Sequence, residues 1–80
     1  MSGVKRLYEL AQERFPGYYI SANHCILGLL AEPEHYTCHV YEMDDAGELE
    51  SVAWGGLGRS VEDTIAKLLE DYERRRNETV

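Results

Sequence analysis

The most unusual absence in this 80-residue sequence is that of positive charge from its centre. No Lys or Arg occurs in residues 15–58, and the net charge of −7 comes entirely from this segment, because the acidic and basic residues of the two flanks balance. A field of one sign repels phosphates and attracts basic surfaces. The sequence therefore predicts a cationic partner for this segment, although an acidic surface can also serve only to keep a small protein soluble. The segment contains seven acidic residues: Glu32, Glu34, Glu42, Asp44, Asp45, Glu48 and Glu50.

Long apolar runs and cysteines are also scarce. No stretch is long enough to cross a membrane, and residues 1–3 lead directly into a polar segment without the apolar core of a signal peptide. The two cysteines, Cys25 and Cys38, are too few for a disulfide scaffold. We expect a cytoplasmic protein with reduced thiols, located in the host cytoplasm if a phage encodes it.

The composition is that of a chain that folds. Hydrophobic residues make up 44% and charged residues 29% of the sequence, which argues against disorder despite the net charge. A chain of this length buries only about 60% of its unfolded surface and has room for one core. We predict a single domain over residues 1–80.

Two segments have the apolar spacing of amphipathic helices. The first covers residues 3–15 and ends at Pro16 and Gly17, and the second covers residues 61–76, followed by a frayed tail at 77–80. Ser60 and Asp63 form a capping-box-like start for the second helix. The predicted core stripes contain Val4, Leu7, Tyr8, Ala11 and Phe15 in the first helix, and Val61, Ile65, Leu68, Leu69 and Tyr72 in the second.

Three segments between the helices favour strands, at residues 18–27, 35–43 and 48–54. A loop over 28–34 separates the first two strands, and the turn at 44–47 makes the last two a hairpin. Gly55, Gly56 and Gly58 are interpreted as a flexible hinge. The predicted fold class is α+β, with a three-stranded antiparallel sheet in an α-β-β-β-α order and both helices on one face of the sheet.

The residues that could carry chemistry are the pairs His24–Cys25 and Cys38–His39. A register in which paired residue numbers sum to 63 would place the histidines on one face of the sheet and the cysteines on the other. A four-ligand metal site cannot form in that arrangement. We therefore predict no catalytic residue, no metal and no cofactor.

The other face of the sheet, with the hairpin, is predicted to be open for a partner. Tyr41 and Trp54 are expected on this open face, whereas Tyr8 and Tyr72 are expected in the core. Cross-strand aromatic packing without a partner is the alternative interpretation. The predicted partner-binding residues are Glu42, Asp44, Asp45, Glu48, Glu50, Tyr41 and Trp54.

The order of elements and the stretch Gly56-Leu57-Gly58-Arg59-Ser60 resemble a double-stranded-RNA-binding domain. In that family, lysines just after the serine grip the phosphates of the RNA groove. Here the matching region contains Val61, Glu62 and Ile65, which lack that charge. The resemblance implies a shared architecture in which RNA binding has been abandoned.

The size and charge placement are also similar to those of small acidic phage inhibitors such as anti-CRISPR proteins, many of which occupy basic nucleic-acid channels. The leading hypothesis is a non-enzymatic module that binds a basic protein surface, as an inhibitor that mimics nucleic acid. Two alternatives stay open. One is a homodimeric structural module that pairs through its open face or a strand edge. The other is residual RNA binding through Lys5, Arg6, Arg59, Lys67 or Arg74 to Arg76.

Overall fold

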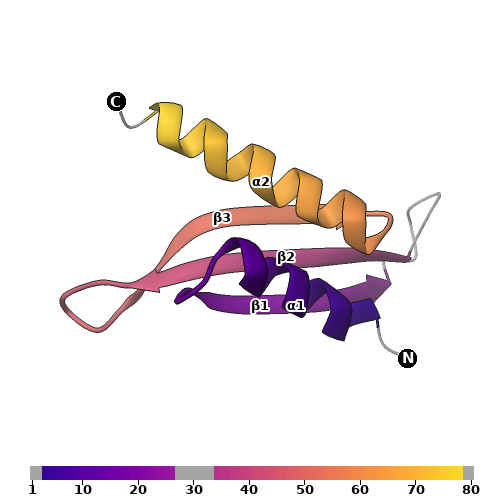
Figure 1. The fold of residues 1–80 in the computed structure, drawn as a ribbon, viewed down its shortest axis with the longest axis horizontal. Helices are drawn as coiled ribbons and strands as arrows, with labels where there is room; N and C mark the ends of the chain where they lie inside the picture. The colour runs from indigo at the N-terminus through magenta and orange to yellow at the C-terminus, as the bar shows by residue number, and fades with distance from the viewer. Residues whose placement is uncertain (1–2, 27–33, 79–80) are drawn as a thin grey trace.

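The fold is an α+β sandwich of two layers, as predicted. The computed structural model describes residues 3–26 and 34–78, and the loop predicted over 28–34 lies almost entirely outside them. A three-stranded antiparallel sheet in the order β1-β2-β3 is covered on one face by both helices (Figure 1). The elements in chain order are α1 (Gly3–Arg14), β1 (Tyr19–Ile26), β2 (Glu34–Met43), β3 (Leu49–Gly58) and α2 (Val61–Glu78).

The core forms where the two helices meet the sheet. Leu7 and Ala11 of α1 and Leu68 of α2 are fully buried, and they close over Val40 of β2 and Ala53 of β3. The predicted stripe of α2 is confirmed, since its residues are buried or pack against the core. The prediction that Tyr8 belongs to the core is wrong, because this side chain is 41% exposed on the flank of α1.

The register between β1 and β2 differs from the prediction. Paired residue numbers sum to 60, so that Ser21 faces His39 and Ala22 faces Cys38. Cys25 faces His35, and the two cysteines are therefore not opposite each other. Turn geometry sets the register of a short hairpin, but the residues between β1 and β2 are too many for such a rule to apply.

The predicted glycine hinge is instead the second half of β3. This strand contains two bulges, one at Val52 and one at Gly56 and Leu57, where two of its residues oppose one of β2. Gly55 and Gly58 are buried directly beneath α2. Their missing side chains let the helix backbone approach the strand closely, so that glycine here serves packing rather than flexibility.

Local hydrogen bonds set the start of α2. The Ser60 hydroxyl accepts a hydrogen bond from the Asp63 backbone N–H at 3.1 Å, and the Asp63 carboxylate accepts one from the Arg59 N–H at 3.0 Å. The first bond confirms the predicted cap, because it satisfies a donor that the first helical turn leaves unpaired, and the second ties the chain before the helix to that turn.

We predict that Gly55→Ala destabilises the protein by about 1–3 kcal/mol, because the new methyl group overfills the contact with α2. An added Cβ would lie 2.6 Å from the Thr64 carbonyl oxygen and 2.9 Å from the Leu68 nitrogen, both of which are backbone atoms. Urea denaturation followed by circular dichroism measures the effect. The exposed Ser21→Ala on β1 is the control, with a change within about 0.5 kcal/mol. Equal stability of the two variants would contradict the prediction.

Candidate protein-binding surface

Charged side chains of α2 reach over the outer edge of β3. The Asp71 carboxylate accepts a hydrogen bond from the Trp54 backbone N–H at 2.8 Å. The Arg75 guanidinium donates to the Ser51 carbonyl at 3.2 Å, and Lys67 donates to the Leu57 carbonyl at 3.0 Å. These are backbone groups that β2 does not pair, so α2 occupies the positions that an added strand would use.

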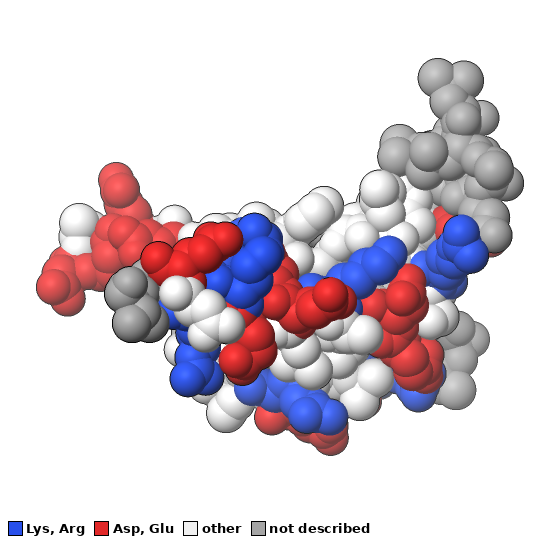
Figure 2. Space-filling view, turned by 90° about the horizontal axis from the view of Figure 1, so that it is seen from above, with Lys and Arg blue, Asp and Glu red and all other residues white. Residues whose placement is uncertain are grey.

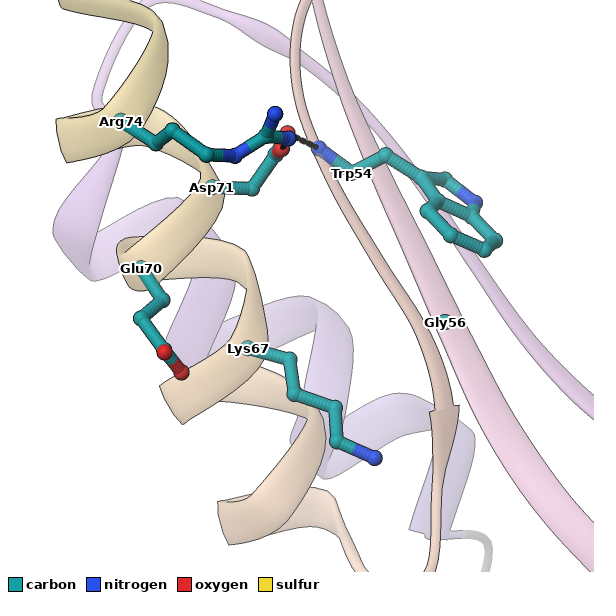
Figure 3. Close-up of a pocket in the computed structure, with 6 residues that line it drawn as sticks. All are labelled: Trp54, Gly56, Lys67, Glu70, Asp71 and Arg74. Atoms are coloured by element: carbon teal, nitrogen blue, oxygen red, sulfur yellow. Dashed lines mark hydrogen bonds and ion pairs between the residues drawn. The ribbon is translucent and has the colours of Figure 1, made fainter. Parts of the chain in front are cut away.

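Asp71 is the centre of this edge contact. Its side chain is only 11% exposed and forms an ion pair with Arg74 (Figure 3). It forms a second ion pair with Arg75 at 2.9 Å. Burial raises the pKa of Asp71, but the Trp54 N–H and the two arginines outweigh it and hold the pKa below its usual range. The carboxylate therefore stays ionised where the edge strand needs an acceptor.

In the described parts of the three strands, no Lys, Arg, Asp or Glu belongs to the sheet face opposite the helices. Strand pairing aligns its residues in rows, because directly opposed residues of antiparallel strands share a face. The face also includes four of the large hydrophobic side chains that are about half exposed: Tyr19, Met43, Leu49 and Trp54. The rows are Tyr19–Tyr41–Ser51, Ser21–His39–Trp54, Asn23–Thr37, Cys25–His35 and Met43–Leu49.

Trp54 and Tyr41 both lie on this open face, and they differ in how they are held. The Trp54 indole points away from α2 and lies over Gly56, at a place where any side chain on residue 56 would collide with the ring (Figure 3). Tyr41 stacks on His39 with ring centroids 4.2 Å apart and is half-buried. Of the two predicted aromatic contacts, Trp54 therefore presents more surface to a partner.

A polar network that sequence reasoning missed joins the open face to α2. The Ser51 hydroxyl lies 2.6 Å from Nε2 of His39, whose Nδ1 lies 2.9 Å from the Tyr41 hydroxyl. Arg75 donates to the Ser51 hydroxyl at 2.9 Å. All three contacts are satisfied when Ser51 donates to Nε2 and the imidazole proton resides on Nδ1. Burial, followed by the charge of Arg75, lowers the pKa of His39, and Asp71 opposes this shift.

The Ser51–His39 contact has the distance of a nucleophile and its base, but its surroundings favour the neutral imidazole. Arg75 repels a proton on His39, and the orienting group is a tyrosine hydroxyl rather than the carboxylate that stabilises an imidazolium. The contact thus fits a structural role, and the absence of catalysis stays a prediction.

The predicted acidic residues gather at the hairpin end of the molecule. Glu42 and Glu50 face each other across β2 and β3, and Asp45 and Glu48 are exposed in the turn. Figure 2 shows red atoms at this end, whereas red and blue atoms are mixed along the rest of the visible face. We call Glu42, Asp45, Glu48 and Glu50 the acidic hairpin.

Two of the predicted acidic contacts have neighbours within the chain. Asp44 has a structural function, because its carboxylate accepts hydrogen bonds from the Ala46 and Glu48 N–H groups, both at 2.9 Å, and closes the turn. Glu42 lines an open groove together with Arg75 and Arg76 of α2. The base-free segment of the sequence is therefore not a base-free surface at Glu42, and the strongest negative field lies at Asp45, Glu48 and Glu50.

The cysteines and histidines of the described chain do not form a metal site. Cys38 is fully buried, and burial raises the pKa of its thiol to about 11, so that the thiolate is scarce at neutral pH. His24 stacks on Tyr36 and lies 3.1 Å from the Glu34 carboxylate. Within residues 3–26 and 34–78, no three His, Cys, Asp or Glu side chains are close enough together to hold a metal ion.

The basic residues that RNA binding would require are occupied by acidic neighbours. Arg6 pairs with Glu62 of α2, and Lys67 lies 3.4 Å from the Asp63 carboxylate. Arg74 and Arg75 both pair with Asp71. These positive side chains thus contribute to contacts between the helices and to ion pairs within α2.

No protein-family model matches the sequence, and no curated protein or solved structure is significantly similar to it. Among the described elements, neither helix is sufficiently long and apolar to span a membrane.

We predict that Asp71→Ala lowers the free energy of unfolding by about 1–3 kcal/mol, because the Trp54 N–H loses a charged acceptor. The variant should also aggregate at a lower concentration, since it exposes part of the β3 edge. The neighbouring Glu70→Ala is the matched control, because Glu70 is exposed and is expected to cost no more than about 0.5 kcal/mol. Urea denaturation and light scattering measure the two effects, and a loss no greater than that of the control would contradict the role of Asp71.

We predict that His39 makes the protein less stable as the pH falls. Because the folded protein lowers the pKa of His39 below 6.5, the unfolded chain takes up the proton first, and stability present above pH 6.5 is lost on acidification. His39→Gln removes this contribution, and its stability should decrease less between about pH 7.5 and about pH 5.5. Urea denaturation of both proteins at the two pH values provides the comparison. Equal losses of stability in the two proteins would contradict the prediction, because they would mean that the pKa of His39 is the same in the folded and the unfolded chain.

Proposed function

We propose that the protein is a non-catalytic binding module whose acidic hairpin docks on a cationic protein surface. The observation that carries this proposal is the gathering of Glu42, Asp45, Glu48 and Glu50 at one end of the molecule. Lys67 and Arg75 of α2 are engaged by Asp63, Asp71 and the Leu57 carbonyl, and Arg75 also lines the groove beside Glu42. A partner with clustered Lys and Arg would thus meet a negative field that the chain itself does not neutralise.

The surface next to the acidic hairpin adds the apolar contact that such an interface needs. Met43 and Leu49 face each other at the base of the hairpin on the open face, and each is about half exposed. Trp54 and Tyr19 extend the same face across the sheet. Because side chains alternate along a strand, Glu42 and Glu50 project from the helix side of the hairpin, so a partner that contacts both groups of residues would enclose the hairpin end.

The class of partner follows from the sign of the charge and from the uncharged sheet. A basic channel that normally binds DNA or RNA phosphates offers the complementary field, so the chain would act there as an inhibitor that mimics nucleic acid. The comparison with small acidic phage inhibitors drawn from the sequence supports the same class of partner. RNA binding is the weaker candidate, because Glu62 pairs with Arg6 where an RNA-binding surface would need free cations.

We expect the triple variant Asp45→Lys, Glu48→Lys, Glu50→Lys to lose its basic partners. The experiment captures proteins from an extract of the source cell on immobilised wild-type and variant protein, and elutes them with salt or with a short DNA duplex. Partners retained by the wild type should be basic nucleic-acid-binding proteins that both eluents release, because charge attraction is screened by salt. Asp44 is left unchanged, since its carboxylate closes the turn.

The matched control is Glu9→Lys, Glu13→Lys, Glu70→Lys, which alters the net charge equally at three exposed acidic positions outside the hairpin. If placement of charge decides binding, this control keeps the partners that the hairpin variant loses. Equal loss of partners by both variants would show that only the net charge of the protein, and not its placement, affects binding. Partners that both variants retain would place the interface elsewhere and reject the proposal.

A further inference from the structure

The two edges of the sheet differ in how well they are protected against the addition of another strand. On β3, two bulges and three side chains of α2, Asp71, Arg75 and Lys67, obstruct the addition of another strand. On β1, the eight residues pair with β2 in one uninterrupted register. The strand contains no Pro, Asp, Glu, Lys or Arg, which are the residues that usually protect an edge.

The β1 edge presents backbone groups that β2 does not use. The Trp54 N–H and the Ser51 carbonyl point outward from β3 to α2, so the residues that pair with them, His39 and Tyr41, direct their backbone groups toward β1. The alternation of antiparallel pairing then assigns Ser21 and Tyr19 to the ladder with β2. It leaves the N–H and carbonyl groups of Ile20, Ala22 and His24 directed outward.

Exposed apolar side chains accompany this edge. Tyr19 and Ile26 at the two ends of β1 are 51% and 73% exposed. Tyr8 of α1 is 41% exposed and lies about 200° around the helix from Arg6, at about 100° per residue. Because Arg6 pairs with Glu62 of α2, Tyr8 belongs to the opposite flank, on the side of the β1 edge. Lys5 and Gln12 lie within about 60° of Tyr8 around the helix, whereas Glu9 lies about 100° from it.

We propose that two copies of the chain pair through their β1 strands to form a continuous six-stranded antiparallel sheet. A twofold axis at Ala22 would pair the outward backbone groups of Ala22 with those of its counterpart, and those of Ile20 with those of His24 in the other copy. Ser21 would then face Asn23 of the second copy. Both helix layers would lie on the same face of the joined sheet, with the Tyr8 flanks of the two α1 helices turned toward each other.

A second copy fits this edge for an electrostatic reason. Two chains that each carry a charge of −7 repel each other, so a self-interface must lie where acidic residues are absent. None of the eight residues of β1 is acidic, and the Glu34 carboxylate, which lies 3.1 Å from His24, is toward the Ile26 end of the strand and away from the axis at Ala22. Antiparallel pairing also places the two acidic hairpins at opposite ends of the dimer, because each hairpin lies beyond the Tyr19 end of β1. This dimer does not depend on the proposed function of the hairpin.

The test is sedimentation of the full chain at a low and a high concentration, with two variants of β1. Ala22→Pro removes the outward N–H while leaving the ladder with β2, a position at which an edge strand tolerates proline. Loss of two hydrogen bonds at the axis should raise the dimer dissociation constant by at least about tenfold. Asn23→Lys keeps every backbone group, places two like charges near the axis and should also weaken the dimer. If circular dichroism shows that the proline variant does not fold, the dissociation constant of the Asn23→Lys variant tests the dimer instead.

The matched control is Ala46→Lys, which makes the same charge change in the exposed β2–β3 turn, away from β1. It should leave the dimer dissociation constant within about twofold of the wild type. Amide exchange adds a second measurement, because the Ile20, Ala22 and His24 N–H groups should become protected as concentration rises. A wild type that stays monomeric at high concentration would overturn the proposal. A dimer that both β1 variants preserve, with those amides unprotected, would also overturn it by placing the interface elsewhere.

Discussion

The close approach of α2 to β3 determines most of this structure. Gly55 and Gly58 leave no side chain between the strand and Thr64 and Leu68 of the helix, and the two backbones come nearly into contact. At that separation, the side chains of Asp71, Lys67 and Arg75 can form hydrogen bonds with the backbone at the edge of β3. A larger residue at either glycine would move the helix away from the strand, and the edge contacts would be lengthened with it.

This contact also decides which charges remain available. The edge of β3 and neighbouring acidic residues engage Lys67, Arg74 and Arg75, so the C-terminal arginine cluster serves the fold. The hairpin extends beyond the helices, where only its base meets the arginines (Figure 1). The acidic character of the molecule is therefore concentrated at one end by the arrangement of the helices, and the proposed binding function follows from that arrangement.

The open face and the two edges of the sheet differ in what covers them. Within residues 3–26 and 34–78, one face of the sheet has no helix, no Lys, Arg, Asp or Glu from the strands, and four half-exposed apolar side chains. One edge is occupied by α2, and the other presents an uninterrupted uncharged strand. The proposed hairpin interface and the proposed β1 dimer both include Tyr19 but otherwise use different residues, and a dimer would present two acidic ends to a partner.

Local pattern was enough to predict the helices, the hairpin turn and the helix cap. Each of these signals lies within a few residues. They are the apolar spacing of Val61, Ile65 and Leu68, the Ser60–Asp63 pair, and Asp44 with Gly47 in the turn. The exposure of Trp54 was also predictable, because side chains alternate along a strand. The acidic residues of the hairpin were foreseen as a group for the same local reason, since a tight turn brings both strands to one end.

Tertiary structure decided what depends on residues distant in the chain. The register of β1 against β2, and with it the contact of Ser51 with His39, cannot be derived from a connection whose geometry no short turn sets. The role of Asp71 also depends on a distant residue, because its partner Trp54 lies seventeen residues away. The expected glycine hinge is a packed strand because α2 covers it. The sequence alone thus determined which elements form, because their signals are local. Only the packing of α2 on β3 decided which charges and which sheet edge are left for a partner.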